Sequence, residues 1–132
     1  MSQENVDKVR EFIDAYNRRD FDAATEWFDP EIDFVLPAHQ SADSGRGSDH
    51  VIRFFEGIDE TFDELRLQPQ EFVDGGHHVA TRLRHHAQGK GSGLVLDEEL
   101  YHQVTTFRGG RMVRIEYFAD WTAALEAAGL LR

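Results

Sequence analysis

Hydrophobic residues in the first half of the chain recur every three or four positions, which is the spacing of one face of an α-helix. Ser2 is the expected N-cap of a first helix, whose apolar stripe consists of Val6, Val9, Phe12, Ile13 and Tyr16. Asp20 is the expected cap of a second helix that Pro30 must end, with one face made of Phe21, Ala24, Trp27 and Phe28. Ser48 or Asp49 can cap a third, with Val51, Phe54, Phe55, Ile58 and Phe62 on its apolar face. The pattern therefore predicts three helices ahead of most of the sheet.

The hydrophobic period changes to two from Leu65 onward, which is typical of β-strands. Turns are expected at Gly75-Gly76, at the glycine-rich segment 89–93 and at Gly109-Gly110, because glycine adopts the backbone angles that tight hairpins need. Pro69 indicates an edge strand or a bulge. Further elements are expected as a short strand over 31–37, a loop over 38–47, one long strand from Leu94 to Phe107, another strand over 111–118, and a closing helix from Asp120 to Gly129. This order predicts an α+β fold with a curved antiparallel sheet.

Composition narrows the class of protein. A chain of 132 residues with 40% hydrophobic residues and ten Phe suits one domain over 1–132. Its formal net charge of −11 disfavours nucleic acid and anionic membranes as partners. The absence of Cys excludes disulfides and thiolate chemistry, and the polar N-terminus lacks the pattern of a signal peptide. We therefore expect a cytoplasmic protein.

Alternation along the predicted strands separates the side chains that face inward from those that face outward. In the segment HHVATRLRHH, the apolar face carries Val79, Thr81, Leu83 and His85. On the next two strands the corresponding faces carry Tyr101, Gln103, Thr105, Val113, Ile115 and Tyr117. A few polar groups on a mostly apolar wall are what a small-molecule site requires.

The segments NRRDFDAATEWFDPEIDFVLP, GSDHVIRFFEGI, GKGSG and FRGGRMVRIEYF, followed by ALEAAGL, resemble the SnoaL-like branch of the nuclear transport factor 2 superfamily over nearly the whole chain. The resemblance implies a cone-shaped fold: three N-terminal helices packed in a curved antiparallel sheet, a short C-terminal helix and an apolar cavity open at one end. It also implies a homodimer that pairs through the outer face of the sheet. The reactions it suggests are a dehydration, an isomerisation or a hydration, and none of them needs a cofactor.

Known chemistries of the superfamily can be compared position by position. Ketosteroid isomerases of this fold use an Asp base, a Tyr and a second Asp. When the strands and the first helix are compared with theirs, this chain has Leu36 at the position of the base, Phe12 at that of the Tyr and Gln103 at that of the second Asp. That mechanism is not expected. Epoxide hydrolases of the fold share an Arg that is followed by an Asp two residues later on the same strand. Neither Arg82 nor Arg84 is followed by an Asp at that spacing. Scytalone dehydratase relies on pocket His and Tyr residues. This chain has comparable side chains in His39, His85, Tyr101 and Tyr117.

Structural interpretations compete with each of these assignments. His85 can be a buried histidine whose hydrogen bonds are simply satisfied, and Tyr16 and Trp27 can be core residues. His39 can lie at the mouth of a pocket or be exposed. His77 and His78 point to opposite faces of a strand, so no metal site is expected. The segment GKGSG lacks the earlier glycine and the following helix of a phosphate-binding loop and is interpreted as a turn.

The leading hypothesis is a pocket for a small, largely apolar molecule, with general acid-base chemistry from His85 assisted by Tyr101, Gln103 or Tyr117. The expected ligand-binding residues are Phe12, Tyr16, Trp27, Leu36, His39, Phe54, Leu83, Thr105, Ile115 and Tyr117. A second hypothesis is a non-catalytic ligand-binding module with the same cavity. A third is a protein-interaction domain.

Overall fold

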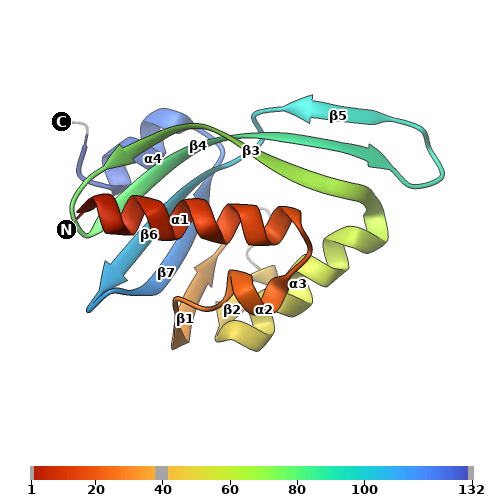
Figure 1. Ribbon diagram of the computed structural model, residues 1–132. Coiled ribbons are helices and arrows are strands. Elements are labelled where there is room, and N and C mark those ends of the chain that lie inside the picture. The colour runs from red at the N-terminus through yellow and green to blue at the C-terminus, as the bar shows by residue number, and fades with distance from the viewer. Residues whose placement is uncertain (1, 38–41, 131–132) are drawn as a thin grey trace.

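A computed structural model of the chain describes residues 2–37 and 42–130. Its helices are α1 (Ser2–Asn17), α2 (Phe21–Ala24), α3 (Ser48–Thr61) and α4 (Trp121–Ala127) (Figure 1). Its strands are β1 (Phe28–Val35), β2 (Gly45–Arg46), β3 (Phe62–Asp74), β4 (His78–Gly89), β5 (Val95–Glu98), β6 (His102–Arg108) and β7 (Arg111–Phe118). None of the helices in these ranges combines the length and the apolar character needed to cross a membrane.

The strands form one sheet in the order β2-β1-β7-β6-β4-β3, and β5 pairs with the far part of β4. All neighbours are antiparallel except β1 and β7, which run parallel. The expectation of a purely antiparallel sheet was therefore wrong at this pair. The physical reason is that β1 reaches β7 through α3 and the whole meander, and such a long connection allows parallel pairing where a hairpin cannot.

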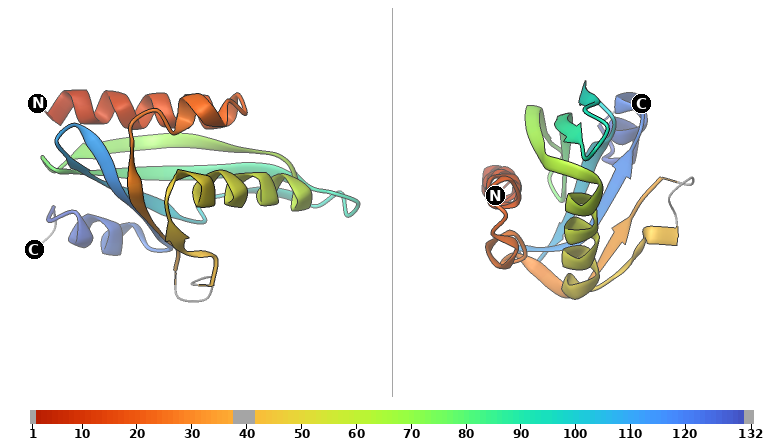
Figure 2. Two further views of the ribbon diagram at one scale, coloured as in Figure 1. Left: turned by 90° about the horizontal axis from the view of Figure 1, so that it is seen from below. Right: turned by 90° about the vertical axis from the view of Figure 1, so that its right-hand side faces the viewer.

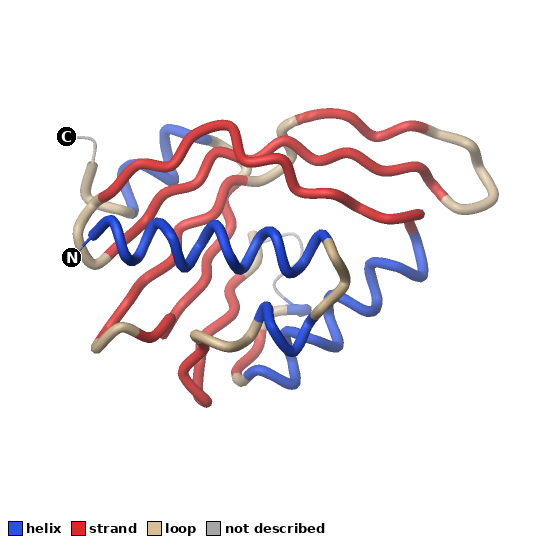
Figure 3. The backbone as a smooth tube through the Cα atoms, in the orientation of Figure 1, coloured by secondary structure: helices blue, strands red, loops and turns tan. Residues whose placement is uncertain are grey.

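The helices cover both faces of the sheet. Helix α1 lies along β3 and β4, and α3 lies against β1 and β3 (Figures 1 and 3). Figure 2 shows α4 on the opposite side of the sheet from α1. The main core lies between the sheet and helices α1 and α3, whereas a smaller cluster under α4 joins Ala80 and Val104 of the sheet to Ala124 and Ala128.

The second helix is shorter than its apolar pattern predicted. Asp20 caps it as expected, because its carboxylate accepts a hydrogen bond from the Ala23 amide at 3.1 Å. The helix ends at Ala24, however, and β1 already begins at Phe28. Pro30 therefore lies inside the strand, in the stretch between Phe28 and Asp33 where the pairing of β1 with β7 is irregular. A missing amide donor is tolerated at such an irregularity.

Helix α3 begins without the side-chain cap predicted from Ser48 or Asp49. Its N-cap is Gly47, which makes no side-chain capping bond. The backbone of Gly47 has φ 95° and ψ 154°, a conformation open almost only to glycine. Within the segment expected to be a loop, Gly45 and Arg46 form the short strand β2 beside β1, and residues 38–41 lie outside the described residues.

The predicted run from Leu94 to Phe107 is divided into two strands. β5 pairs with the end of β4, β6 pairs with its beginning, and residues 99–101 cross between them. The three expected hairpin turns are present, and β3 shifts register after Pro69, as its proline predicted. Strand β7 shifts register as well, so that fully buried Met112 takes the inward place expected of Val113.

Candidate active site

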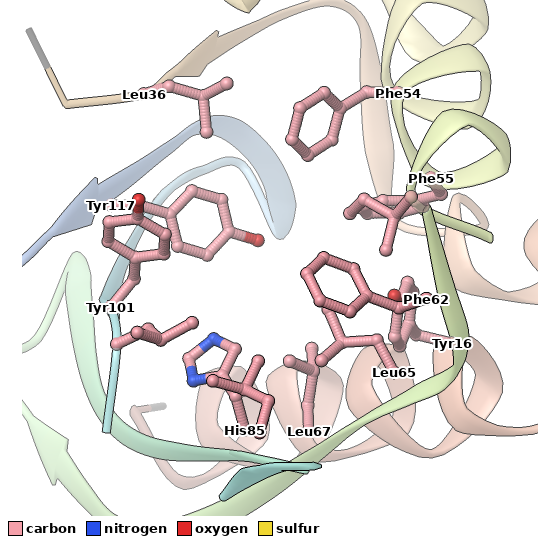
Figure 4. A pocket seen from close by; sticks show the side chains of 13 residues that line it. Tyr16, Leu36, Phe54, Phe55, Phe62, Leu65, Leu67, His85, Tyr101 and Tyr117 are labelled. Atoms are coloured by element: carbon pink, nitrogen blue, oxygen red, sulfur yellow. The ribbon is translucent and has the colours of Figure 1, made fainter. Parts of the chain in front are cut away.

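A cavity of about 240 Å³ lies between α1, α3 and the inner face of the sheet. Figure 4 shows its lining side chains around a central space. The aromatic and aliphatic lining residues are Leu36, Phe54, Phe55, Ile58, Phe62, Leu65, Leu67, Leu96 and Leu100, and the polar ones are Tyr16, His85, Tyr101 and Tyr117. A smaller cavity of about 150 Å³ is enough for benzene. The space therefore suits a molecule of one or two rings.

The imidazole of His85 is the most polar side chain in this wall. β4 places it there because Thr81, Leu83 and His85 alternate onto the inner face, and all three are buried. Figure 4 shows the ring pointing into the space, and its Nδ1 finds no hydrogen-bond partner among the described residues. Burial, and to a smaller extent nearby His102, lowers the pKa of His85 to about 4. The ring is therefore neutral at pH 7.

Three tyrosines complete the polar part of the lining. Tyr101 meets the His85 ring edge-on at 6.1 Å, and Tyr117 meets Phe34 edge-on at 5.6 Å. In Figure 4, Tyr101 and Tyr117 lie on the side opposite Phe54 and Phe55. Burial raises the pKa of Tyr117 and also that of Tyr101, and it raises the pKa of Tyr16 to about 12 despite the Arg19 guanidinium beside it. All three phenols are therefore protonated hydrogen-bonding groups.

No charged side chain lines this cavity within the described part of the chain. Nor do the described residues bring together three His, Asp or Glu side chains that could hold a metal ion. Neutral donors and acceptors on an apolar wall favour an uncharged guest, since a bare charge placed there would lose its hydration without a counter-charge.

Gln103 lies next to the cavity wall and does not line it. It is fully buried on β6, opposite Thr81 on β4 and Tyr117 on β7. Its amide donates a hydrogen bond to the Thr105 hydroxyl at 2.9 Å, while its own Oε1 and the hydroxyl of Thr81 have no partner among the described residues. These residues form a buried polar cluster behind the wall.

The other predicted site residues occupy different places. Phe12, Leu83 and Ile115 are buried in the main core and do not line the cavity. Trp27 is half-buried against the main core and does not line the cavity, and its indole donates a hydrogen bond to Glu11 at 3.0 Å. His39 lies outside the described residues. The structure thus gathers Tyr16, Leu36, Phe54, His85, Tyr101 and Tyr117 around one space.

Seven lining residues were absent from the sequence-based set: Phe55, Ile58, Phe62, Leu65, Leu67, Leu96 and Leu100. Phe55, Ile58 and Phe62 were recognisable in the apolar stripe of the third predicted helix. Leu65 and Leu67 alternate on β3, which is the signal for a shared face. Leu96 and Leu100 had no such signal, because their inward position depends on the break between β5 and β6.

His102 marks that break on the opposite face of the sheet. Its Nδ1 accepts a hydrogen bond from the Leu83 amide at 3.2 Å, at a point of β4 that neither β5 nor β6 pairs. The ring packs edge-on against Trp121 of α4 at 5.4 Å, and its Nε2 lies 3.8 Å from the Glu99 carboxylate. The buried side chain thereby fixes the crossing segment that carries Tyr101 to the cavity.

Comparison with known protein families identifies the family of this chain. The sequence pattern of the SnoaL-like domain matches residues 9–115, which is most of the chain. The chain belongs to the SnoaL-like family. No curated protein matches this family member significantly in sequence.

Solved structures share the fold of this SnoaL-like chain. A nuclear-transport-factor-2-like protein of unknown function from Burkholderia pseudomallei has 25% sequence identity and a TM-score of 0.78, with 93% of this chain and 95% of that one covered. TerC, crystallised with polyporic acid, has 20% identity and a TM-score of 0.75, with coverage of 96% and 98%. A protein with a ketosteroid isomerase-like fold from Catenulispora acidiphila, in complex with trimethylamine, has 15% identity and a TM-score of 0.74, with coverage of 93% and 92%.

Proposed function

We propose that this SnoaL-like protein binds a compact, uncharged and largely apolar molecule in the cavity, with an oxygen of the guest hydrogen-bonded to His85. The observation that carries the proposal is the buried, neutral imidazole of His85, which points into an apolar cavity. Among the described lining residues it is the one side chain that carries nitrogen. A guest oxygen that bonds to the side of the ring facing the space gains a hydrogen bond of about 0.5–1.5 kcal/mol.

The proposed guest follows from the lining. The neutral imidazole accepts or donates one hydrogen bond, and the tyrosine hydroxyls can donate to a carbonyl or hydroxyl oxygen. Aromatic rings from α3 and β3 provide the apolar contacts. Among proteins of the same fold, one was co-crystallised with polyporic acid and another is in complex with trimethylamine, and this agrees with a ligand-binding cavity. The guest class is therefore a small ring carrying one hydroxyl or carbonyl group.

Calorimetric titration with 4-ethylphenol tests this proposal. The expected result is saturable binding of one molecule per chain, and His85→Leu should weaken it about tenfold because one hydrogen bond of about 1–1.5 kcal/mol is lost. His86→Leu is the matched control, since it removes the neighbouring histidine of β4, whose side chain is exposed and does not line the cavity. Equal weakening by both substitutions, or none by His85→Leu, would contradict the proposal.

A second candidate function is general acid-base catalysis in the same cavity, with His85 as the base and Tyr101 or Tyr117 as a hydrogen-bonding partner, while Gln103 stays behind the wall. It is favoured by the neutral imidazole, whose nitrogen lone pair is available at pH 7 next to phenolic donors. A pKa of about 4 makes this ring a weak base in the empty cavity. We therefore rank binding ahead of catalysis, and consider a dehydration, isomerisation or hydration without a cofactor as the corresponding chemistry.

Deuterium exchange distinguishes the two candidates. A base beside a bound ketone removes a proton from the carbon next to the carbonyl, so 2-tetralone in D2O should lose its α-proton signals faster with the protein than without it. His85→Leu should abolish the acceleration. Binding of 2-tetralone without any acceleration would leave the chain a binding module and exclude His85 as a base for carbon acids.

We also propose a cytoplasmic homodimer that pairs through the outer face of the sheet. On that face Arg82 pairs with Glu99 at 2.7 Å and Arg114 with Glu116 at 3.1 Å, and both arginines remain about 40% exposed. Such half-exposed ion pairs can exchange partners across an interface. Sedimentation equilibrium should give twice the chain mass of 15.2 kDa, and a single-chain mass at micromolar concentration would contradict pairing.

A further inference from the structure

A second cavity of about 450 Å³ adjoins the first. Its walls come from the end of α3 and the start of β3, from the end of β4, and from the turn leading into β5. The lining residues are Thr61, Phe62, Gly89, Lys90, Ser92, Leu94, Val95 and Leu96. Phe62 and Leu96 belong to both linings. The two spaces are thus neighbours that meet at these two side chains, and we call them the inner and the outer cavity.

Leu94 and Val95 expose large apolar side chains in the wall of the outer cavity. Their exposed fractions are 73% and 67%, which sets them apart from the other large hydrophobic residues in the described part of the chain. A single exposed hydrophobic residue is ordinary on a protein surface. Two consecutive ones in the wall of a cavity that adjoins an apolar one provide a surface that an apolar ligand can cover.

The wall that carries these residues is fixed to the body of the protein. The Lys90 amide donates to the Thr61 carbonyl at 3.1 Å, and the Gly89 amide donates to the Leu94 carbonyl at 2.8 Å. The turn between them closes through Gly91 and Gly93, whose φ angles of 77° and 72° suit glycine. Figure 1 shows the hairpin of β4 and β5 extending past the end of α3. The outer cavity is therefore a built feature with a defined position.

We propose that the ligand of the inner cavity is elongated: its oxygen-bearing ring lies beside His85 while an apolar tail passes Phe62 and Leu96 and covers Leu94 and Val95. This inference rests on the proposed function, and it adds a tail to the ligand class. The chemistry of the outer wall supports it, because leucine and valine contribute apolar area while the polar lining residues Thr61, Lys90 and Ser92 are exposed to water, in which a tail can end.

The test is a titration series with 4-ethyl-, 4-butyl- and 4-hexylphenol, which share a head group and differ in tail length. Each methylene that leaves water should strengthen binding to the wild-type protein by up to about fourfold. In the double variant Leu94→Ser/Val95→Thr the gain from ethyl to hexyl should largely disappear, while the affinity for 4-ethylphenol stays within about twofold. Both substituted side chains are exposed, so the variant is expected to fold. Val73→Thr, under α4 and remote from both linings, is the matched control.

The outcomes separate the two proposals. If no phenol binds the wild-type protein, the proposed function fails and the inference fails with it. If 4-ethylphenol binds but tail length has no effect, or the double variant keeps the full gain, the elongated ligand is wrong while the inner site stands. If the double variant instead halves the mass measured by sedimentation, Leu94 and Val95 are a contact between two copies of the chain, and the inference is overturned.

Discussion

His85 places a titratable ring in a buried, mostly apolar wall, and this costs free energy when the ring is protonated. The buried Nδ1 has no partner among the described residues, and burial holds the pKa of the ring at about 4. Residues that are costly in the folded state are expected at functional sites. Replacing His85 should therefore change both the pH dependence of the protein's stability and its stability at neutral pH.

The first prediction concerns pH and His85→Leu. Because the pKa of His85 is lowered from about 6.5 in the unfolded chain to about 4 in the folded one, the unfolded chain binds the proton more tightly. The wild-type free energy of unfolding should therefore be unaffected by this residue above pH 6.5 and should fall as the pH drops towards 4, by about 2–3 kcal/mol. The variant should lack this part of the pH dependence.

Urea unfolding of both proteins between pH 7.5 and pH 4.5 measures the difference. At pH 7.5 the variant should be as stable as the wild type or more stable by about 1 kcal/mol, since the unpartnered polar atom is gone. Acid effects of the carboxylates in ion pairs, such as Asp97 and Glu99, cancel in the comparison because both proteins retain them. Parallel stability curves over this range would show that His85 titrates normally in the folded protein.

At the scale of the elements, hydrophobic periodicity and turn residues predicted most of the fold. Helices α1 and α3, the three glycine turns and the cap at Asp20 follow from local spacing and side-chain chemistry. The break between β5 and β6 does not, because it depends on His102 occupying a gap beside β4. The parallel pair β1–β7 likewise depends on contacts between distant segments. The candidate site was predictable to the same extent. The alternation of side chains along β4 identified His85, whereas the inward positions of Leu96 and Leu100 depend on the break between β5 and β6.

The start of α3 gives a prediction at this scale. Gly47→Ala should destabilise the protein by about 1–3 kcal/mol, because the φ of 95° there is strained for any residue with a side chain. Since α3 carries Phe54 and Phe55 to the cavity, we also expect weaker binding of 4-ethylphenol.

Gly57→Ala in the middle of the same helix is the matched control. An added methyl group there meets no atom within 4 Å, so alanine's better helix propensity should stabilise the protein by about 0.5–1 kcal/mol. Thermal unfolding of the two variants should shift in opposite directions. Shifts of the same sign would refute the assignment of strain to Gly47.

For the whole molecule, the contrast between surface and cavity is the feature that constrains the ligand. The chain has a formal net charge of −11, yet within the described residues its cavity is lined by neutral groups alone. Binding of an uncharged guest should therefore respond little to ionic strength, because screening acts on charges and not on apolar contacts. The dissociation constant of 4-ethylphenol should change less than about twofold between roughly 20 mM and 500 mM NaCl, as measured by calorimetry. A change of tenfold or more would indicate a charged ligand site elsewhere on the surface.

The central claim, that a guest hydrogen-bonds to His85 inside the cavity, is tested most directly by the nitrogen resonances of the histidine rings. Titration of ¹⁵N-labelled protein with 4-ethylphenol at pH 7 should shift one imidazole pair in a saturable manner. That pair should be absent from the spectrum of His85→Leu, while the other histidines stay unchanged. Saturable binding with every imidazole resonance unmoved would contradict the account.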